Sequence, residues 1–106
     1  MGWATGYIAR LGRGETVSFR PRGDSMRGKI NSGDLVTVAP AGDRALAVGD
    51  IVLCKVAGSQ YLHLIKAIRG APGEPDARYQ IGNNRGRING WVGASSIYGV
   101  VTRVEP

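Results

Sequence analysis

Residues 50–68, DIVLCKVAGSQYLHLIKAI, decide the fold of this chain. Residues 50–57 form an apolar run rich in β-branched side chains, and residues 61–68 form a second apolar run. Between the two runs, residues 58–60 read Gly-Ser-Gln, a sequence that suits a tight turn because glycine adopts positive φ angles. The stretch therefore predicts a β-hairpin with its turn at residues 58–60.

Alternation along the second strand of this hairpin divides its side chains between two faces. His63, the only histidine, is expected beside Tyr61 and Ile65, whereas Lys66 is expected on the opposite face. A joint site of His63 and Lys66 is therefore not expected. Cys54 on the first strand is expected to be buried, although a hairpin can also place it across from His63 as a Cys–His pair.

Outward from the hairpin, the chain reads as short strands joined by turns. The 17 glycines and 5 prolines favour such turns over long helices. One short helix is expected within residues 1–13, where Trp3, Tyr7 and Leu11 recur at helical spacing. The remainder, residues 15–105, predicts an all-β fold, a partly open barrel or coiled antiparallel sheet. Further strands are expected at residues 16–20, 35–38, 79–81 and 97–104, and loops at residues 21–33, 71–76 and 82–90.

The length of 106 residues predicts a single domain over residues 1–106. No run of 18 apolar residues occurs, so no membrane anchor is expected. One cysteine and one histidine can form neither an internal disulfide nor a four-ligand zinc site. A cytoplasmic chain without metal or cofactor is therefore expected.

Three groups of residues are candidates for chemistry. Ser25 lies on a glycine-preceded turn that can expose its hydroxyl, and His63 is the side chain whose ordinary pKa suits a general base. The polar loop at residues 82–90 contains Asn83 and Asn89, either of which can orient a histidine through its carbonyl oxygen. Each of these residues is more often structural than functional when taken alone.

Five blocks of the sequence together resemble the LexA-type repressor peptidases and the signal peptidases. They cover most of the chain and fit the families in order and spacing. The blocks are Gly-Asp-Ser-Met at 23–26 with its Gly-Asp-Leu-Val strand at 33–36, Val-Gly-Asp-Ile-Val at 48–52, Tyr-Leu-His-Leu-Ile at 61–65, Gly-Asn-Asn at 82–84 and Tyr-Gly-Val-Val at 98–101.

The resemblance implies that Ser25 is a nucleophile and that the turn residues Gly23, Asp24 and Met26 contribute backbone N–H groups to an oxyanion hole. His63 falls at the general-base position, which is a lysine in LexA-type and bacterial signal peptidases. Archaeal and endoplasmic-reticulum signal peptidases have a histidine there, so the chain resembles that branch.

The histidine branch also uses a late aspartate, and Asn89 lies nearest that position here, with Asn83 as an alternative orienter of His63. The expected function is that of a serine endopeptidase cleaving a peptide bond in another chain. The alternative is an inactive peptidase-like fold that binds a protein or nucleic acid, because an asparagine cannot stabilise imidazolium by charge. The inactive alternative predicts that Ser25 and His63 lie beyond hydrogen-bond reach.

Features that flank the LexA and signal peptidase cores are not evident in this sequence. Only 24 residues precede Ser25, and no Ala-Gly pair occurs among them, so a repressor domain with self-cleavage is not expected. The formal charge of +6 permits an acidic partner, but no nucleic-acid-binding signature accompanies the basic residues before position 30. An exposed sheet edge makes a dimer conceivable.

Overall fold

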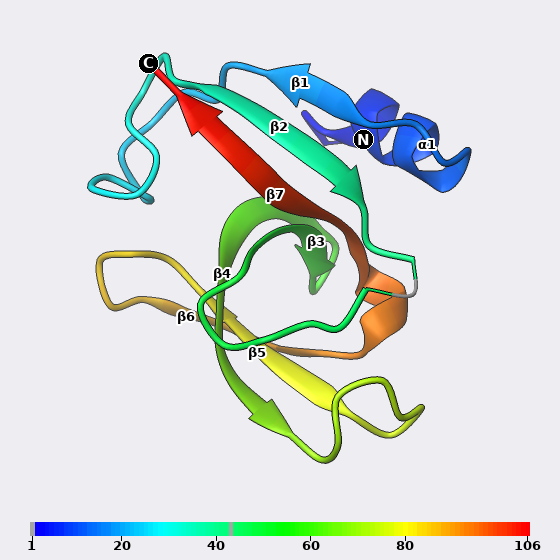
Figure 1. Ribbon diagram of the computed structural model, residues 1–106. Coiled ribbons are helices and arrows are strands. Elements are labelled where there is room, and N and C mark those ends of the chain that lie inside the picture. The colour runs from blue at the N-terminus through cyan, green and yellow to red at the C-terminus, as the bar shows by residue number, and fades with distance from the viewer. Residues whose placement is uncertain (1, 43) are drawn as a thin grey trace.

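The computed structural model describes residues 2–42 and 44–106, which form a seven-stranded antiparallel sheet and one short α-helix (Figure 1). The strand order is β1-β2-β7-β3-β4-β5-β6, so β1 and β6 are the two edges of an open, coiled sheet. The predicted all-β class is therefore confirmed, and the sheet does not close. The elements are α1 (Thr5–Gly12), β1 (Val17–Phe19), β2 (Leu35–Pro40), β3 (Ile51–Val56), β4 (Ser59–Arg69), β5 (Arg78–Gly82), β6 (Ile88–Val92), the 3-10 turn η1 (Ala94–Ser96) and β7 (Ile97–Glu105).

The helix begins later than the sequence suggested, at Thr5, so Trp3 precedes it. Leu11 is its buried residue, and Gly14, with φ of +83°, takes the chain out of the helix toward β1. Ala4, just before the helix, is completely buried. Within the described part of the chain, no helix has the length and apolar character needed to cross a membrane.

The central hairpin of β3 and β4 forms as predicted, but its turn lies one residue earlier. Val56 pairs with Ser59, so the turn is Ala57-Gly58, with φ angles of 49° and 86° that match a two-residue hairpin loop. The predicted turn at residues 58–60 is therefore wrong. The position of the turn sets the register of the hairpin, in which His63 pairs with Val52.

Strand β6 is a correction to the sequence interpretation, which expected a loop throughout residues 82–90. Residues from Ile88 onward pair with β5 and form the second edge of the sheet. This strand reads Ile-Asn-Gly-Trp-Val, and of its five residues Val92 is buried. An edge strand with so few buried positions lacks the apolar alternation that identifies strands in a sequence.

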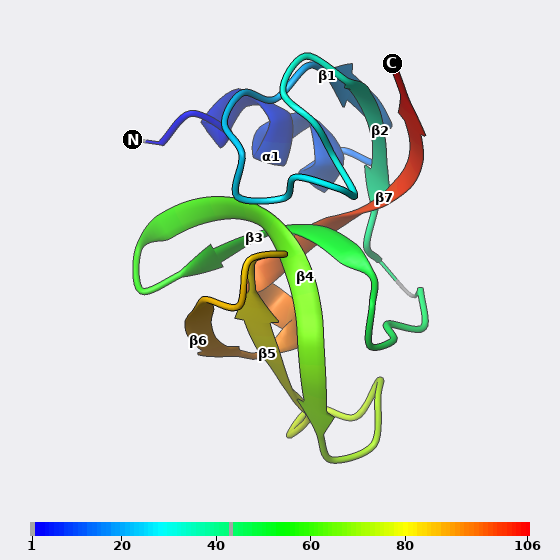
Figure 2. The same cartoon turned by 90° about the vertical axis from the view of Figure 1, so that its left-hand side faces the viewer.

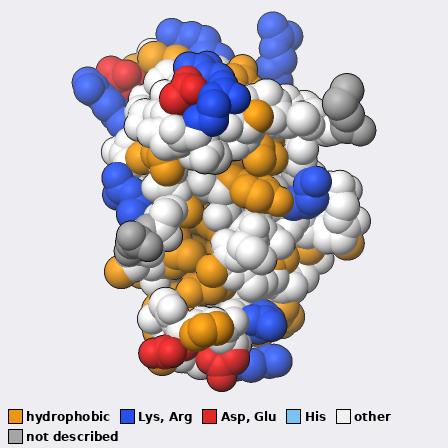
Figure 3. All heavy atoms as spheres, turned by 90° about the vertical axis from the view of Figure 1, so that its right-hand side faces the viewer, with side chains coloured by type: hydrophobic (Ala, Val, Ile, Leu, Met, Phe, Trp, Pro, Cys, Tyr) orange, Lys and Arg blue, Asp and Glu red, His pale blue; other side chains and the backbone are white. Residues whose placement is uncertain are grey.

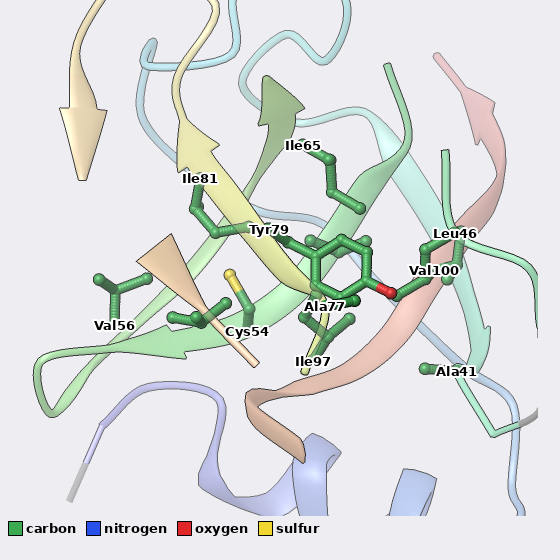
Figure 4. Packing of buried hydrophobic residues seen from close by; sticks show 12 residues of the cluster. Ala41, Leu46, Cys54, Val56, Ile65, Ala77, Tyr79, Ile81, Ile97 and Val100 are labelled. Atoms are coloured by element: carbon green, nitrogen blue, oxygen red, sulfur yellow. The ribbon is translucent and has the colours of Figure 1, made fainter. Parts of the chain in front are cut away.

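Two apolar clusters lie on the two faces of the coiled sheet. The first surrounds Tyr79 and includes Cys54 and Ile65 (Figure 4). The partly buried Tyr61 packs against it. The second joins Leu62 and Leu64 of β4 to helix α1 and to the long loop between β1 and β2. These clusters confirm the predicted separation of Tyr61 and Ile65 from Leu62 and Leu64, whereas Lys66 falls at a bulge between the paired residues Ile65 and Ala67.

Candidate functional site

Ser25 lies in the loop of residues 20–34 between β1 and β2, which passes over one end of β4 (Figure 2). The side chains of Met26 and Ile30 anchor the loop to the sheet. They belong to the second apolar cluster and are 5 % and 3 % exposed. Its backbone folds into turns, with Arg27 N–H donating to Asp24 O at 3.1 Å. The buried residue next to Ser25 thus holds the half-buried serine at the surface of the sheet.

Ser25, His63 and Asn89 form a continuous line of hydrogen bonds. The distance from His63 Nε2 to Ser25 Oγ is 3.2 Å, and the distance from His63 Nδ1 to Asn89 Oδ1 is 2.7 Å. With the amide oxygen facing Nδ1, that nitrogen carries the proton, and Nε2 accepts the hydrogen bond of the serine hydroxyl. The structure brings together all three residues that the sequence singled out for this role.

Asn89 reaches His63 because it is the extra residue of a β-bulge. Ile81 of β5 pairs with Gly90 and Gly82 pairs with Ile88, so Asn89 has no partner across the ladder. Gly90, with φ of +148°, completes the irregular backbone. Bulges of this kind re-aim a side chain, and here the side chain crosses from β6 to β4, two strands away.

His63 is buried, and burial lowers its pKa below the ordinary value because desolvation penalises the imidazolium. The hydrogen bond with Asn89 raises the pKa, whereas the charges of Arg87 and Lys66 lower it. The ring of Tyr61 stacks on the imidazole, with centroids 4.9 Å apart. The net effect keeps His63 neutral at neutral pH, the protonation state that a general base requires.

Asn83 does not orient His63, so that alternative is wrong. Its side-chain oxygen accepts the backbone N–H groups of Arg85 and Arg87, at 2.8 Å and 2.9 Å. This pattern is an asparagine-stabilised turn, the ordinary role of the residue in a glycine-rich loop. Asn83 therefore shapes the turn that leads into β6 and Asn89.

Asn84 and Arg85 hold the serine loop, a role that the sequence interpretation missed. The Asn84 backbone N–H donates to Ser25 O at 2.9 Å, and its side-chain Nδ2 donates to Arg27 O at 2.8 Å. Arg85 Nη1 pairs with Asp24 Oδ2 at 2.8 Å. The Gly-Asn-Asn motif pointed to this segment, but nothing local in the sequence indicated its partners.

The backbone around Ser25 offers donors for an anion. Within the described residues, the N–H groups of Gly23, Asp24, Ser25 and Met26 donate to no protein acceptor. Gly23 has φ of +105°, a conformation that glycine adopts without strain. Backbone N–H groups in such a turn are suited to stabilise a developing oxyanion.

A small cavity of mixed polar and apolar lining opens beside the serine. Its volume is ≈ 30 Å³, about the space of one water molecule in liquid. Met26, Ile30 and Leu62 supply its apolar wall. A cavity of this size accepts a hydrogen or a methyl group and excludes large side chains.

The other candidate nucleophile, Cys54, lies away from this line. It pairs with Tyr61 across the hairpin, not with His63, and its thiol donates to Tyr61 O at 3.7 Å. Burial raises the pKa of this thiol to about 12. The predicted burial of Cys54 is confirmed, and the alternative of a Cys54–His63 pair is wrong. Among the described residues, no three His, Cys, Asp or Glu side chains gather as metal ligands would.

Part of the basic charge is neutralised locally. Arg10 and Arg13 both pair with Glu15, at 3.0 Å each, and Arg85 pairs with Asp24. On the face drawn in Figure 3, Lys and Arg side chains are scattered around an apolar middle rather than gathered into one patch. This distribution is typical of a solvated basic surface.

Comparison with known proteins adds no relative: the sequence matches no family model and no curated protein. A function for this chain is therefore inferred from the geometry of its site.

Proposed function

We propose that this chain is a serine endopeptidase with a fold of the LexA and signal peptidase type. Ser25 is the nucleophile, His63 the general base and Asn89 the residue that orients His63. The observation that carries the proposal is the hydrogen-bonded line from Ser25 Oγ through both nitrogens of His63 to Asn89 Oδ1. A histidine with a purely structural role does not need a serine hydroxyl beside its unprotonated Nε2. A histidine that activates a serine nucleophile does need one there.

In the proposed reaction, Ser25 Oγ attacks the carbonyl carbon of a peptide bond while His63 Nε2 takes the hydroxyl proton. Backbone N–H groups of the 23–25 turn stabilise the oxyanion of the tetrahedral intermediate. His63 then gives the proton to the leaving amine, which leaves an acyl ester on Ser25. Water, deprotonated by His63, hydrolyses that ester and restores the serine.

The substrate is proposed to be an extended polypeptide that adds to the sheet beside the serine. Residues 59–63 of β4 pair with β3 on one side, while the pairing of β4 with β5 begins at Leu64. The other edge of residues 59–63 therefore offers main-chain groups to a peptide strand, apart from Gln60 O, which accepts the indole N–H of Trp3. The small cavity next to Ser25 favours glycine, alanine or serine beside the scissile bond.

The inactive alternative is less well supported. It predicts a Ser25–His63 separation beyond hydrogen-bond reach, and the 3.2 Å distance counts against it. The missing charge on Asn89 lowers the expected rate without removing the nucleophile or its base.

A peptide library cut from a whole proteome, read by mass spectrometry, tests the proposal. The wild-type chain is expected to cleave a subset of peptides after small residues, and Ser25→Ala and His63→Ala to cleave none. Ser32→Ala, an exposed serine in the same loop, is the matched control and is expected to cleave as wild type. Identical cleavage by Ser25→Ala, or no cleavage by the wild-type chain, contradicts the proposal.

A further inference from the structure

A second cleft, larger than the cavity beside Ser25, lies between the N-terminal segment with helix α1 and the residues that follow β1. Its volume is ≈ 380 Å³, within the range of pockets that hold a ligand or a large side chain. The residues that line it are three aromatics, two arginines and a proline: Trp3, Tyr7, Phe19, Arg20, Pro21 and Arg22.

The aromatic wall of this cleft is held in one arrangement. Tyr7 and Phe19 stack with centroids 4.4 Å apart, and Trp3 contacts Phe19 edge-on at 5.7 Å. The indole Nε1 of Trp3 donates to Gln60 O at 3.2 Å, which fixes the ring against β4. Even so, Trp3 is 52 % exposed. A rigid, half-exposed tryptophan is the kind of side chain that dominates protein recognition sites.

The charge of the cleft has one sign. Arg20 and Arg22 line it, and no acidic residue does. Arg20 Nη1 donates to Gly33 O at 2.7 Å, which anchors its guanidinium beside the cleft. Within the described residues, neither Arg20 nor Arg22 pairs with a carboxylate, unlike Arg10, Arg13 and Arg85. Their fork of N–H donors is thus available to a carboxylate of a bound chain.

The cleft adjoins the candidate active site. Pro21 and Arg22 line both the 380 Å³ cleft and the small cavity beside Ser25. Trp3 also touches Gln60, which lies three residues before His63 on the unpaired edge of β4. Three residues of an extended strand span about 10 Å. A peptide strand that lies on this edge with its scissile bond at Ser25 therefore reaches Trp3 three or four residues away.

We infer that this cleft is a recognition subsite for the polypeptide substrate, and that it takes an aromatic residue followed or preceded by an acidic one. The aromatic ring packs against Trp3 and Tyr7, and the carboxylate pairs with Arg20 and Arg22. The subsite lies three or four residues from the scissile bond. The inference rests on the proposed peptidase function, because the position of the scissile bond sets the register of the bound chain.

Equilibrium binding to the Ser25→Ala chain tests this inference without requiring turnover. The probes are fluorescein-labelled dodecapeptides with a central Ala-Ala pair. Phe-Asp is placed four positions before that pair in one peptide and four positions after it in another, and a third peptide carries Ser-Asn instead. One of the two Phe-Asp peptides is expected to bind at least about tenfold more tightly than the Ser-Asn peptide.

Matched variants assign the preference to the cleft. Trp3→Leu and Arg22→Gln are each expected to remove most of it, whereas Trp91→Leu and Arg44→Gln, which alter an exposed tryptophan and arginine outside the cleft, are expected to keep it. Arg22 is exposed and its replacement leaves the core intact, so this variant remains informative if Trp3→Leu unfolds.

Three results would overturn the inference. They are equal affinity for all three peptides, an unchanged preference in the Arg22→Gln chain, and displacement of the peptide by an equimolar single-stranded oligothymidine, which would mark the cleft as a nucleic-acid site. The same peptides also show whether the peptidase proposal itself fails. In that case the Phe-Asp peptide binds the wild-type chain through the cleft and is recovered uncleaved.

Discussion

His63 and Asn89 lie on β4 and β6, two strands separated by β5, and yet His63 Nδ1 and Asn89 Oδ1 are 2.7 Å apart. The bulge at Asn89 makes this contact, because the residue stands outside the ladder between β5 and β6. The contact assigns the Nδ1 proton and presents Nε2 to Ser25. In the proposed peptidase, Asn89 supplies the orientation that a triad aspartate would provide, without its charge.

The missing charge can be restored by a single substitution. Asn89→Asp is expected to raise kcat/KM at least about tenfold, because a carboxylate stabilises the imidazolium that forms during attack. The same carboxylate raises the pKa of His63 and moves the acidic limb of the pH profile to higher pH. Asn89→Ala is expected to lower kcat/KM, since the ring loses its orienting partner. Gln80→Glu, the same change of charge on β5, is the control, and a similar gain there would show that the effect is not specific to position 89.

Two side-chain contacts join the serine loop to residues 84 and 85, and these contacts are expected to differ in their effect on catalysis. Asn84→Ala removes the hydrogen bond to Arg27 O and is expected to lower kcat about tenfold, because small displacements of a nucleophile are costly. Arg85→Ala removes an ion pair whose partners are 57 % and 67 % exposed, and such pairs contribute little in water. Its kcat is therefore expected to stay close to that of the wild type. Steady-state kinetics on one cleaved peptide compares the two, and equal losses would contradict this account.

The pH profile follows from the burial of His63. Its pKa in the folded chain lies below the ordinary value of 6.5, so kcat/KM is expected to persist below pH 6.5 before the acidic limb begins. An acidic limb centred above pH 6.5 would contradict the lowered pKa.

The same shift affects stability. An unfolded chain, with the ordinary pKa, takes up a proton on His63 before the folded chain does as pH falls. The free energy of unfolding is therefore expected to decrease as pH falls from about 6.5 toward the folded-state pKa. Urea unfolding at several pH values measures this slope, and His63→Gln is expected to remove that part of it.

The thiol of Cys54 is expected to be inert. Its pKa is raised to about 12, so almost no thiolate exists at pH 8, and the side chain is completely buried. Iodoacetamide is expected to alkylate Cys54 in denaturant but not in the folded chain, and Cys54→Ala is expected to retain cleavage. Rapid alkylation of the folded chain, detected by mass spectrometry, would show that the thiol is accessible.

Much of the architecture could be predicted because its causes are local. Alternating β-branched residues and a glycine turn predict the β3–β4 hairpin, and the spacing of Tyr7 and Leu11 predicts the helix. The observed turn begins one residue earlier than the predicted one, because Ala57 adopts a positive φ. Positive φ is uncommon for alanine, so the sequence gives no sign of it. A turn at residues 58–60 would place Lys55 opposite His63, whereas the observed turn at Ala57-Gly58 places Val52 there.

The sequence by itself determined which side chains are able to do chemistry here: one histidine, a serine on a glycine turn and asparagines in a polar loop. The tertiary structure alone decided which asparagine reaches His63 and which residues hold the serine loop. Both of these outcomes depend on strand β6 and its bulge, and therefore on pairing between separate segments of the chain. Local patterns carry the preference of each segment for helix, strand or turn, whereas register and bulges are set by the packing of the whole sheet.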